Sequence, residues 1–331
     1  MSNTPFIATS VPAMPLCQQG VALLDHWGVI EVCGVDNASF LQGQLSNDVL
    51  QLTSTQARLA AFCSAKGRMQ ASFVAVKREN GDILLVCSKD VLAATVKRLS
   101  MFVMRAKASL RDASGDFSVY GLVGPTACAD HAGLVHPWQA QNEGDTSTVQ
   151  LYPTQGLMRQ LWLSPNGTTP PSGPTLPLSD WHYGEVMGGV ATLSAPLVDA
   201  FVPQMLNYES IGGVSFKKGC YPGQEVVARS QFRGTLKRRA YLACLLQNPP
   251  DPAATHEVAV PLFAGQEVYC GQDPDQPCGL VVQVGHHPAG QWVAIVSLQT
   301  SAAKDEHLAV GRPDGPAIAL LPLPYPLLED I

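Results

Sequence analysis

Short runs of alternating apolar and polar residues fill the first third of the chain. Runs typical of strands are "WGVIEVCG" (27–34), "ARLAAFCS" (57–64), "MQASFVAVKR" (69–78) and "ILLVCS" (83–88), with a turn at "ENGD" before the last of them. Helices are predicted over "NASFLQGQLS", with Asp36 as a helix N-cap, and from about Lys89 to Met104, before "RAKASLR". Because strands mix with helices and one hairpin, the pattern favours an α+β sheet over a doubly wound parallel one.

The end of the chain has a different pattern. The stretch "QNPPDPAA" (247–254) is the best candidate for a domain boundary because its prolines interrupt regular structure. Beyond it, "GQEVYCG", "CGLVVQVGHH" and "QWVAIVSLQ" are short strand-like runs separated by turns. This pattern predicts a small C-terminal β-barrel or sandwich over residues 247–331.

Composition narrows the class of protein. With 331 residues, 46% of them hydrophobic, the chain can form two or three domains, and its net charge of −6 argues against a nucleic-acid coat. Nine scattered cysteines without a CxxC pair are typical of a reduced cytoplasmic protein and argue against a structural zinc or a self-contained iron-sulfur cluster. The first 20 residues resemble a flexible tail, and no apolar run is long enough to cross a membrane. We therefore expect a cytoplasmic protein with no bound metal and no membrane partner.

Positive charge is concentrated in one segment, residues 217–239, which we call the basic island. It holds seven of the 21 Lys and Arg residues and one acid, Glu225, so its local charge is +6. Arg229, Arg233 and Lys237 follow one another at intervals of four, and Gly234 suggests that a short helix ends before the strand-like "KRRAYLACLL". The segment is either an anion-binding surface or a solvated charged face, and spacing alone leaves both open.

Cys220 lies near the start of the basic island. The residues "YPGQ" that follow it form a good turn, and "QEVVARS" is a short helix candidate. A thiol just ahead of a helix N-terminus, with Lys217 and Lys218 nearby, can ionise more readily than an ordinary cysteine. The alternative is a small packed residue, and no His or carboxylate partner stands at the spacing of a protease triad.

The motif "KGCYPGQE" at 218–225, followed by "VVARSQFRG" and "KRR", resembles the signature of the YgfZ family of folate-binding proteins, relatives of the glycine-cleavage T-protein, an aminomethyltransferase. The segments "HWGVIEVCGVDNASFLQGQLSNDV", "CSAKGRM" and "FVPQMLNYESIGGVSF" are similar to the same family. The resemblance implies a T-protein-like folate-binding fold around a central opening. Residues 21–246 would form this region, with two interleaved α+β domains.

The resemblance also implies a function. Such proteins bind tetrahydrofolate or a derivative and support the assembly or repair of iron-sulfur clusters. Their expected partners are the cluster-assembly machinery and radical-type tRNA-modifying enzymes, including those of methylthiolation. In this interpretation Cys220 is the functional thiol and Lys218 helps to hold it as the thiolate.

The same resemblance assigns a folate site. Glu185, in "WHYGEVMGG", matches the glutamate that would accept the paired N–H donors of a pterin, although a helix-surface acid is an equal alternative. Trp27 or Trp181 would stack on the ring system, unless they are core residues. The remaining candidates, from the motif and the basic island, are Gln224, Arg229, Arg233 and Arg239, and the arginines would hold the folate carboxylates.

One departure from the T-protein pattern bears on the reaction. Where T-proteins carry an acidic pair after the glycine-rich loop, this chain has Gln70, Ala71 and Ser72. No carboxylate stands there for proton transfer, so we expect an accessory factor rather than an aminomethyltransferase of the glycine-cleavage type. Direct tRNA binding through Arg233 and Lys237 to Arg239 is a third possibility.

Overall fold

The computed structural model describes residues 18–125, 128–131, 133–232, 236–246 and 262–328. Residues 1–17 of the expected tail lie outside the described residues, and so do Arg233 and the expected boundary at 247–254. The described helices are α1 (Asn37–Gln42), α2 (Lys89–Ser100), α3 (Leu178–Met187) and α4 (Gln224–Phe232), with 3₁₀ turns at Val49–Gln51, Ala129–His131, Ala195–Leu197, Pro203–Leu206 and Ala302–Lys304.

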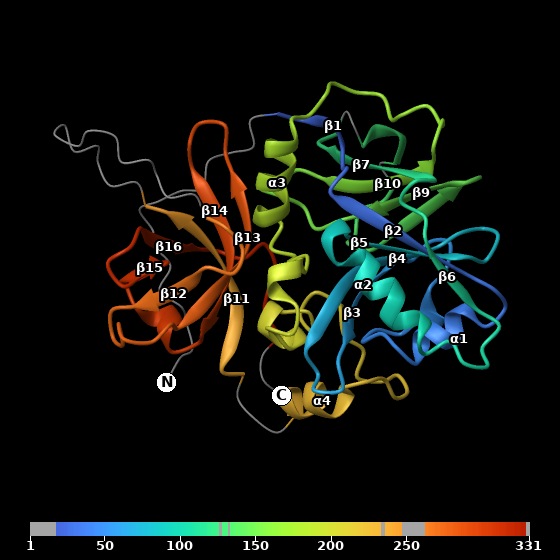
Figure 1. The fold of residues 1–331 in the computed structure, drawn as a ribbon. Helices are drawn as coiled ribbons and strands as arrows, with labels where there is room; N and C mark the ends of the chain where they lie inside the picture. Colours follow the sequence, from blue (N-terminus) through green and yellow to red (C-terminus); the bar gives the residue numbers. More distant parts are fainter. Residues whose placement is uncertain (1–17, 126–127, 132, 233–235, 247–261, 329–331) are drawn as a thin grey trace.

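Three antiparallel β-layers form the molecule (Figure 1). One sheet has the order β1 (Gly20–Leu23), β7 (Phe117–Val123), β10 (Arg159–Pro165), β9 (Thr146–Gln150), β8 (Ala140–Glu143). The second has the order β3 (Arg58–Cys63), β4 (Met69–Lys77), β5 (Ile83–Ser88), β2 (Trp27–Cys33), β6 (Ser109–Asp112). A closed barrel contains β11 (Arg238–Leu245), β14 (Trp292–Gln299), β13 (Gly279–His286), β12 (Glu267–Cys270), β15 (Leu308–Val310) and β16 (Ala317–Leu321).

The alternation of side chains along the strands explains how one hydrophobic cluster includes residues from both sheets and the barrel. On β4, Val74 and Val76 belong to a cluster shared with the first sheet, α3 and the barrel, whereas Phe73 and Ala75 belong to a cluster under α1 and α2. Successive side chains of a strand point to opposite faces, so a strand covered on both faces is apolar throughout. The barrel follows the same rule, because Leu242 on β11 packs into the shared cluster.

Helix α3 stands between the barrel and the two sheets (Figure 1). Two glycines allow this close packing. A Cβ atom on Gly121 of β7 would lie 2.3 Å from the Trp181 ring, and one on Gly285 of β13 would lie 2.7 Å from the Cα atom of Tyr183. Strands β7 and β13 can approach α3 this closely only because each has a glycine at the contact. The position of α3 is therefore fixed from two sides.

The prediction of an α+β fold with a small C-terminal barrel is confirmed. The barrel includes β11, which precedes residue 247. Two local details differ from the expectation. Helix α2 ends at Ser100 rather than Met104, and Asp36 precedes α1 without capping it, because its carboxylate accepts the backbone N–H of Lys107 at 2.7 Å.

Candidate functional site

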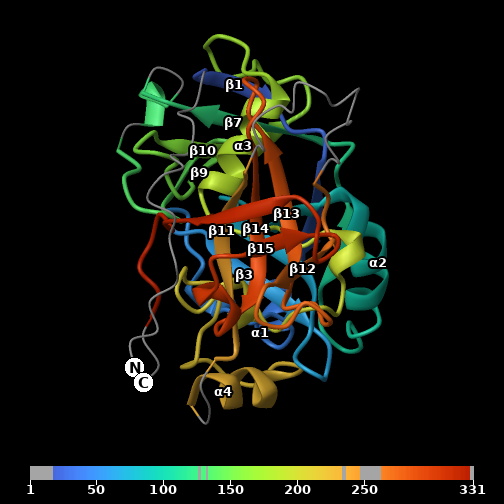
Figure 2. The same ribbon diagram turned by 90° about the vertical axis from the view of Figure 1, so that its left-hand side faces the viewer.

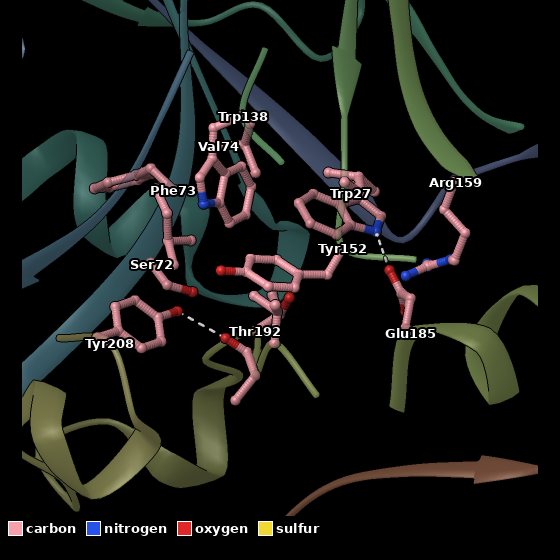
Figure 3. A pocket seen from close by; sticks show the side chains of 14 residues that line it. Trp27, Ser72, Phe73, Val74, Trp138, Tyr152, Arg159, Glu185, Thr192 and Tyr208 are labelled. Carbon is pink, nitrogen blue, oxygen red and sulfur yellow. Dashed lines mark hydrogen bonds between the residues drawn. The ribbon is translucent and has the colours of Figure 1, made fainter. Parts of the chain in front are cut away.

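A small cavity lies where the two sheets meet α3 (Figure 3). Its volume is about 40 Å³. Apolar and aromatic side chains from both sheets and the connecting loops form most of the wall; they include Leu59, Phe73, Val74, Trp138, Leu151 and Tyr152. Two charged side chains, Glu185 and Arg159, lie close together at one end of the cavity, beside Trp27. The cavity is thus an apolar space with its charge at a single end.

Glu185 is one of the two buried carboxylates of α3, with Asp180 as the other. Its Oε1 atom accepts the indole Nε1–H of Trp27 at 3.1 Å (Figure 3). Its Oε2 atom lies 3.2 Å from Nδ1 of His182 and 3.4 Å from Nε2 of Gln283 on the barrel. The second sheet, α3 and the barrel therefore all hold one side chain, so the carboxylate has a fixed direction.

Several nearby side chains keep Glu185 ionised. Burial by itself raises the pKa of a carboxyl group, because the charged form loses its hydration. Here the hydrogen bond from His182, the nearby imidazole of His26 and the guanidinium of Arg159 outweigh burial and hold the pKa of Glu185 well below its usual range. The site is therefore a strong acceptor for N–H donors over the whole neutral range of pH.

Arg159, from β10, supplies the opposite charge. Its guanidinium lies over the Trp181 ring at 4.2 Å, and a Cβ atom on Gly188 would lie 3.0 Å from its Nη1 atom. Burial lowers the pKa of Arg159 to about 10, and its Nε and Nη2 atoms are buried without a hydrogen-bond partner. Buried donors of this kind are costly unless an acceptor meets them, so the cavity is suited to a ligand with acceptor atoms.

A second, larger cavity adjoins the first. It has a volume of about 320 Å³ and shares Trp27, Glu185 and Thr192 with the small cavity. Its other walls come from His26, Ser88, His182 and the barrel strand β13. Glu185 consequently separates the two spaces, with Arg159 lining only the small one and the two histidines only the large one.

The motif around Cys220 forms a separate, exposed region. Gly223 has φ of +79° and the N–H of Gln224 donates to Tyr221 O at 3.2 Å, which confirms the predicted turn. Cys220 is exposed and precedes α4 by a few residues. Helix α4 lies at one end of the molecule in both ribbon views (Figures 1 and 2), away from α3.

Two named bacterial proteins are similar to this chain along most of its length. The tRNA-modifying protein YgfZ of Edwardsiella ictaluri is 30% identical over 257 residues, which make up 72% of this chain and 75% of that protein. The protein of the same name from Cronobacter sakazakii is 28% identical over 268 residues, 78% of this chain and 81% of that protein. No protein-family model matches the chain. The chain belongs to the YgfZ family.

Membership of the YgfZ family, expected from "KGCYPGQE", is thereby confirmed. The fold agrees with that of the glycine cleavage system aminomethyltransferase T from Bartonella henselae. The two structures align with a TM-score of 0.63 and 14% identity, over 94% of this chain and 87% of the other. The predicted T-protein-like fold is therefore confirmed as well. In the part of the chain that the structure describes, no helix is long and apolar enough to cross a membrane.

Within this YgfZ-family chain, Lys218 has contacts that the sequence did not suggest. Its Nζ atom donates to the carbonyl oxygens of Gln42 at 2.6 Å and Leu45 at 2.5 Å, at the end of α1, and lies 4.9 Å from the Tyr221 ring centre. Burial lowers the pKa of Lys218 to about 8. The ammonium group thus anchors the motif to α1, and its assigned help to Cys220 stays a prediction.

The structure separates the other candidate folate residues. Trp27 and Glu185 meet at the cavity, whereas Trp181 is fully buried beneath Arg159 and does not line it. Exposed Arg229 pairs with Glu225 at 3.1 Å.

Arg239 differs from Arg229 in being buried. Its Nη1 atom donates to Glu209 at 2.7 Å and its Nη2 atom to the Leu328 carbonyl at 3.0 Å. Gln224, the first residue of α4, lies with Cys220 rather than with Glu185. The assignment of Gln224 and the arginines to folate stays a prediction.

Arg159, His26 and His182 were not found by sequence reasoning. The signal for Arg159 is a single cation in the mostly apolar run "GLMRQLWLS". His26 precedes Trp27 and His182 follows Trp181, so the two histidines are 156 positions apart in the sequence. Only the fold brings their rings to a centroid distance of 4.4 Å.

Proposed function

We propose that this protein is a tetrahydrofolate-binding accessory factor that supports iron-sulfur-dependent enzymes of tRNA modification. The observation that carries the proposal is the ionised, buried Glu185 beside Trp27 at the wall of the cavity. The family membership supports the link to tRNA modification, because its relatives are named tRNA-modifying proteins. The aminomethyltransferase T fold supports a folate ligand in this cavity.

The chemistry of the site suits a pterin. The amidine-like edge of a pterin offers two N–H donors, and a carboxylate accepts such a pair in bidentate fashion. Glu185 has a fixed direction and stays charged, as this pairing requires. The unpartnered Nε and Nη2 donors of Arg159 would meet an acceptor atom of the ligand, and Trp27 offers an aromatic wall.

Both cavities contribute to the proposed site. A volume of about 40 Å³ holds only about three or four water molecules, too few for a bicyclic ring. The adjoining space of about 320 Å³ provides the room, and Glu185 is accessible from both. We therefore expect the ring system to lie at the shared wall made of Trp27, Glu185 and Thr192.

Lining residues also bear on aminomethyl transfer. Among the described residues that line the small cavity, Glu185 is the single carboxylate. Ser72 of β4 also lines it, and its hydroxyl oxygen accepts the backbone N–H of Leu193 at 2.9 Å. With Glu185 engaged by the pterin, no second carboxylate of that wall would be left for proton transfer. This supports an accessory role, in which exposed Cys220 provides the reactive group.

The proposal is tested by titrating the protein with tetrahydrofolate under anaerobic conditions and following Trp fluorescence. We expect saturable binding by the wild type. Glu185→Gln should weaken it at least about 10-fold, because a hydrogen bond to a charged group contributes about 1.5–3 kcal/mol. Glu79→Gln, at an exposed position, is the matched control and should bind like the wild type.

Two results would contradict the proposal. One is the absence of saturable binding by the wild type, and the other is equal affinity of the Glu185→Gln and wild-type proteins. A melting curve of each variant separates loss of the ligand site from loss of the fold.

A further inference from the structure

We infer that His26, His182 and Glu185 form a binding site for a divalent first-row transition-metal ion, such as Zn²⁺, at the wall of the larger cavity. Each residue offers one ligand atom, and the three atoms lie within 4.8 Å of one another. Two imidazoles and a carboxylate are the donor set of many zinc and non-haem iron sites. The inference reverses the expectation, drawn from the cysteines, that the protein has no metal site.

The distances suit a shared ion. Donor atoms bound to one tetrahedral or octahedral ion at about 2.0–2.2 Å lie about 2.8–3.6 Å apart. Oε2 of Glu185 is 3.2 Å from Nδ1 of His182 and 3.7 Å from Nε2 of His26. Both histidine side chains are about one third exposed, so small rotations of the rings can complete the triangle.

His26 gives an independent reason to expect a ligand. Both nitrogens of its ring are buried and lack a hydrogen-bond partner, and 3.7 Å to Glu185 is too long for a hydrogen bond. A neutral imidazole has one donor and one acceptor nitrogen, and leaving both unsatisfied is unfavourable. An ion bound to Nε2 would satisfy the acceptor nitrogen and hold the ring in its place.

Surrounding residues complete the features of a metal site. Oε1 of Glu185 accepts the Trp27 indole N–H, which orients the carboxylate and leaves Oε2 for the ion. A pterin paired with both oxygens would use the same Oε2 atom, so the ion binds the folate-free protein. The cavity of about 320 Å³ adjoins all three ligands, so water or a small ligand can occupy the remaining coordination positions. To bind the ion through Nδ1, the neutral His182 ring carries its single proton on Nε2.

The test uses the full chain without a histidine tag, freed of metal with a chelator. Titration with ZnCl₂ by calorimetry should give one ion per chain, and CoCl₂ should give the visible absorption bands of a protein-bound cobalt ion. His26→Ala and His182→Ala should each weaken binding at least 10-fold, and MgCl₂ should not bind there, because Mg²⁺ prefers oxygen ligands. His136→Ala, at an exposed histidine, is the control and should keep the stoichiometry and affinity.

The absence of stoichiometric binding would overturn the inference, and so would unchanged affinity in the double variant His26→Ala/His182→Ala with a wild-type melting curve. The metal titration contains no folate. Its failure therefore leaves the folate proposal standing, and a failure of the folate titration leaves the metal site standing.

Discussion

The position of α3 on the barrel can be tested with one methyl group. In Gly285→Ala, the new Cβ atom on β13 would lie 2.7 Å from Cα of Tyr183 and 2.9 Å from the carbonyl oxygen of His182. Non-bonded carbon atoms in contact lie about 3.5–4.0 Å apart, so the helix must move by about 0.8 Å or more. Both contacts are with backbone atoms, which cannot turn aside as a long side chain can.

We expect two measurable effects. Overpacking of this kind costs about 1–3 kcal/mol, which should lower the apparent melting temperature of a 331-residue chain by about 1.5–4 °C. The movement of α3 also carries Glu185, whose hydrogen bonds to Trp27 on β2 and Gln283 on β13 are already 3.1 and 3.4 Å long. A further lengthening of 0.8 Å breaks these bonds, so tetrahydrofolate affinity should fall about 10-fold or more.

The assay combines melting curves with the tetrahydrofolate titration. Gly115→Ala is the matched control, since a Cβ atom there meets no atom within 4 Å. The control should melt and bind like the wild type. If Gly285→Ala did the same, the close approach of β13 to α3 would not determine the position of Glu185, and the structural reasoning behind the site would be refuted.

Two further predictions concern the "KGCYPGQE" motif. Cys220→Ala should leave the melting temperature and folate binding unchanged, because the side chain is exposed. The same variant should fail to complement a strain that lacks its own family member. Full complementation would exclude a reactive thiol. Since the pKa of Lys218 is about 8 when folded and higher when unfolded, the unfolded chain binds more protons between about pH 8 and 10.5. The stability of the wild type relative to Lys218→Met, from urea midpoints, should therefore rise by about 1 kcal/mol over that interval and stay flat below pH 8; a decrease would contradict the assigned environment.

The strands were predictable because their apolar residues recur with the period of a sheet. The runs 27–34, 69–78 and 83–88 correspond to β2, β4 and β5. The end of α2 was not predictable in the same way. Apolar residues continue past Ser100 through Met101 and Met104, but these two side chains are exposed in the structure. The apolar pattern gives the positions of apolar residues but not whether the fold buries them. The predicted end of α2 therefore lies beyond the observed one.

The candidate site was only partly accessible from the sequence. Trp27 and Glu185 came from a family resemblance, and the structure brings them together. Arg159 and the His26–His182 pair depend on contacts between different layers, which no local pattern records. Arg239 is buried against Glu209, a contact that no local pattern records. Its assignment to the folate carboxylates stays a prediction.

One hairpin connects the two regions that the proposed function requires. Strands β3 and β4 carry Leu59 and Phe73 to the wall of the small cavity. At the turn between them, a Cβ atom on Gly67 would lie 2.8 Å from Cβ of Val226 on α4, and one on Gly223 would lie 2.5 Å from the Cα atom of Gly67. The turn and the Cys220 motif therefore fit together only because both carry glycine. A ligand that shifts β4 at the cavity would press directly on the segment that holds Cys220, so the hairpin is a direct physical connection between the proposed folate site and the thiol.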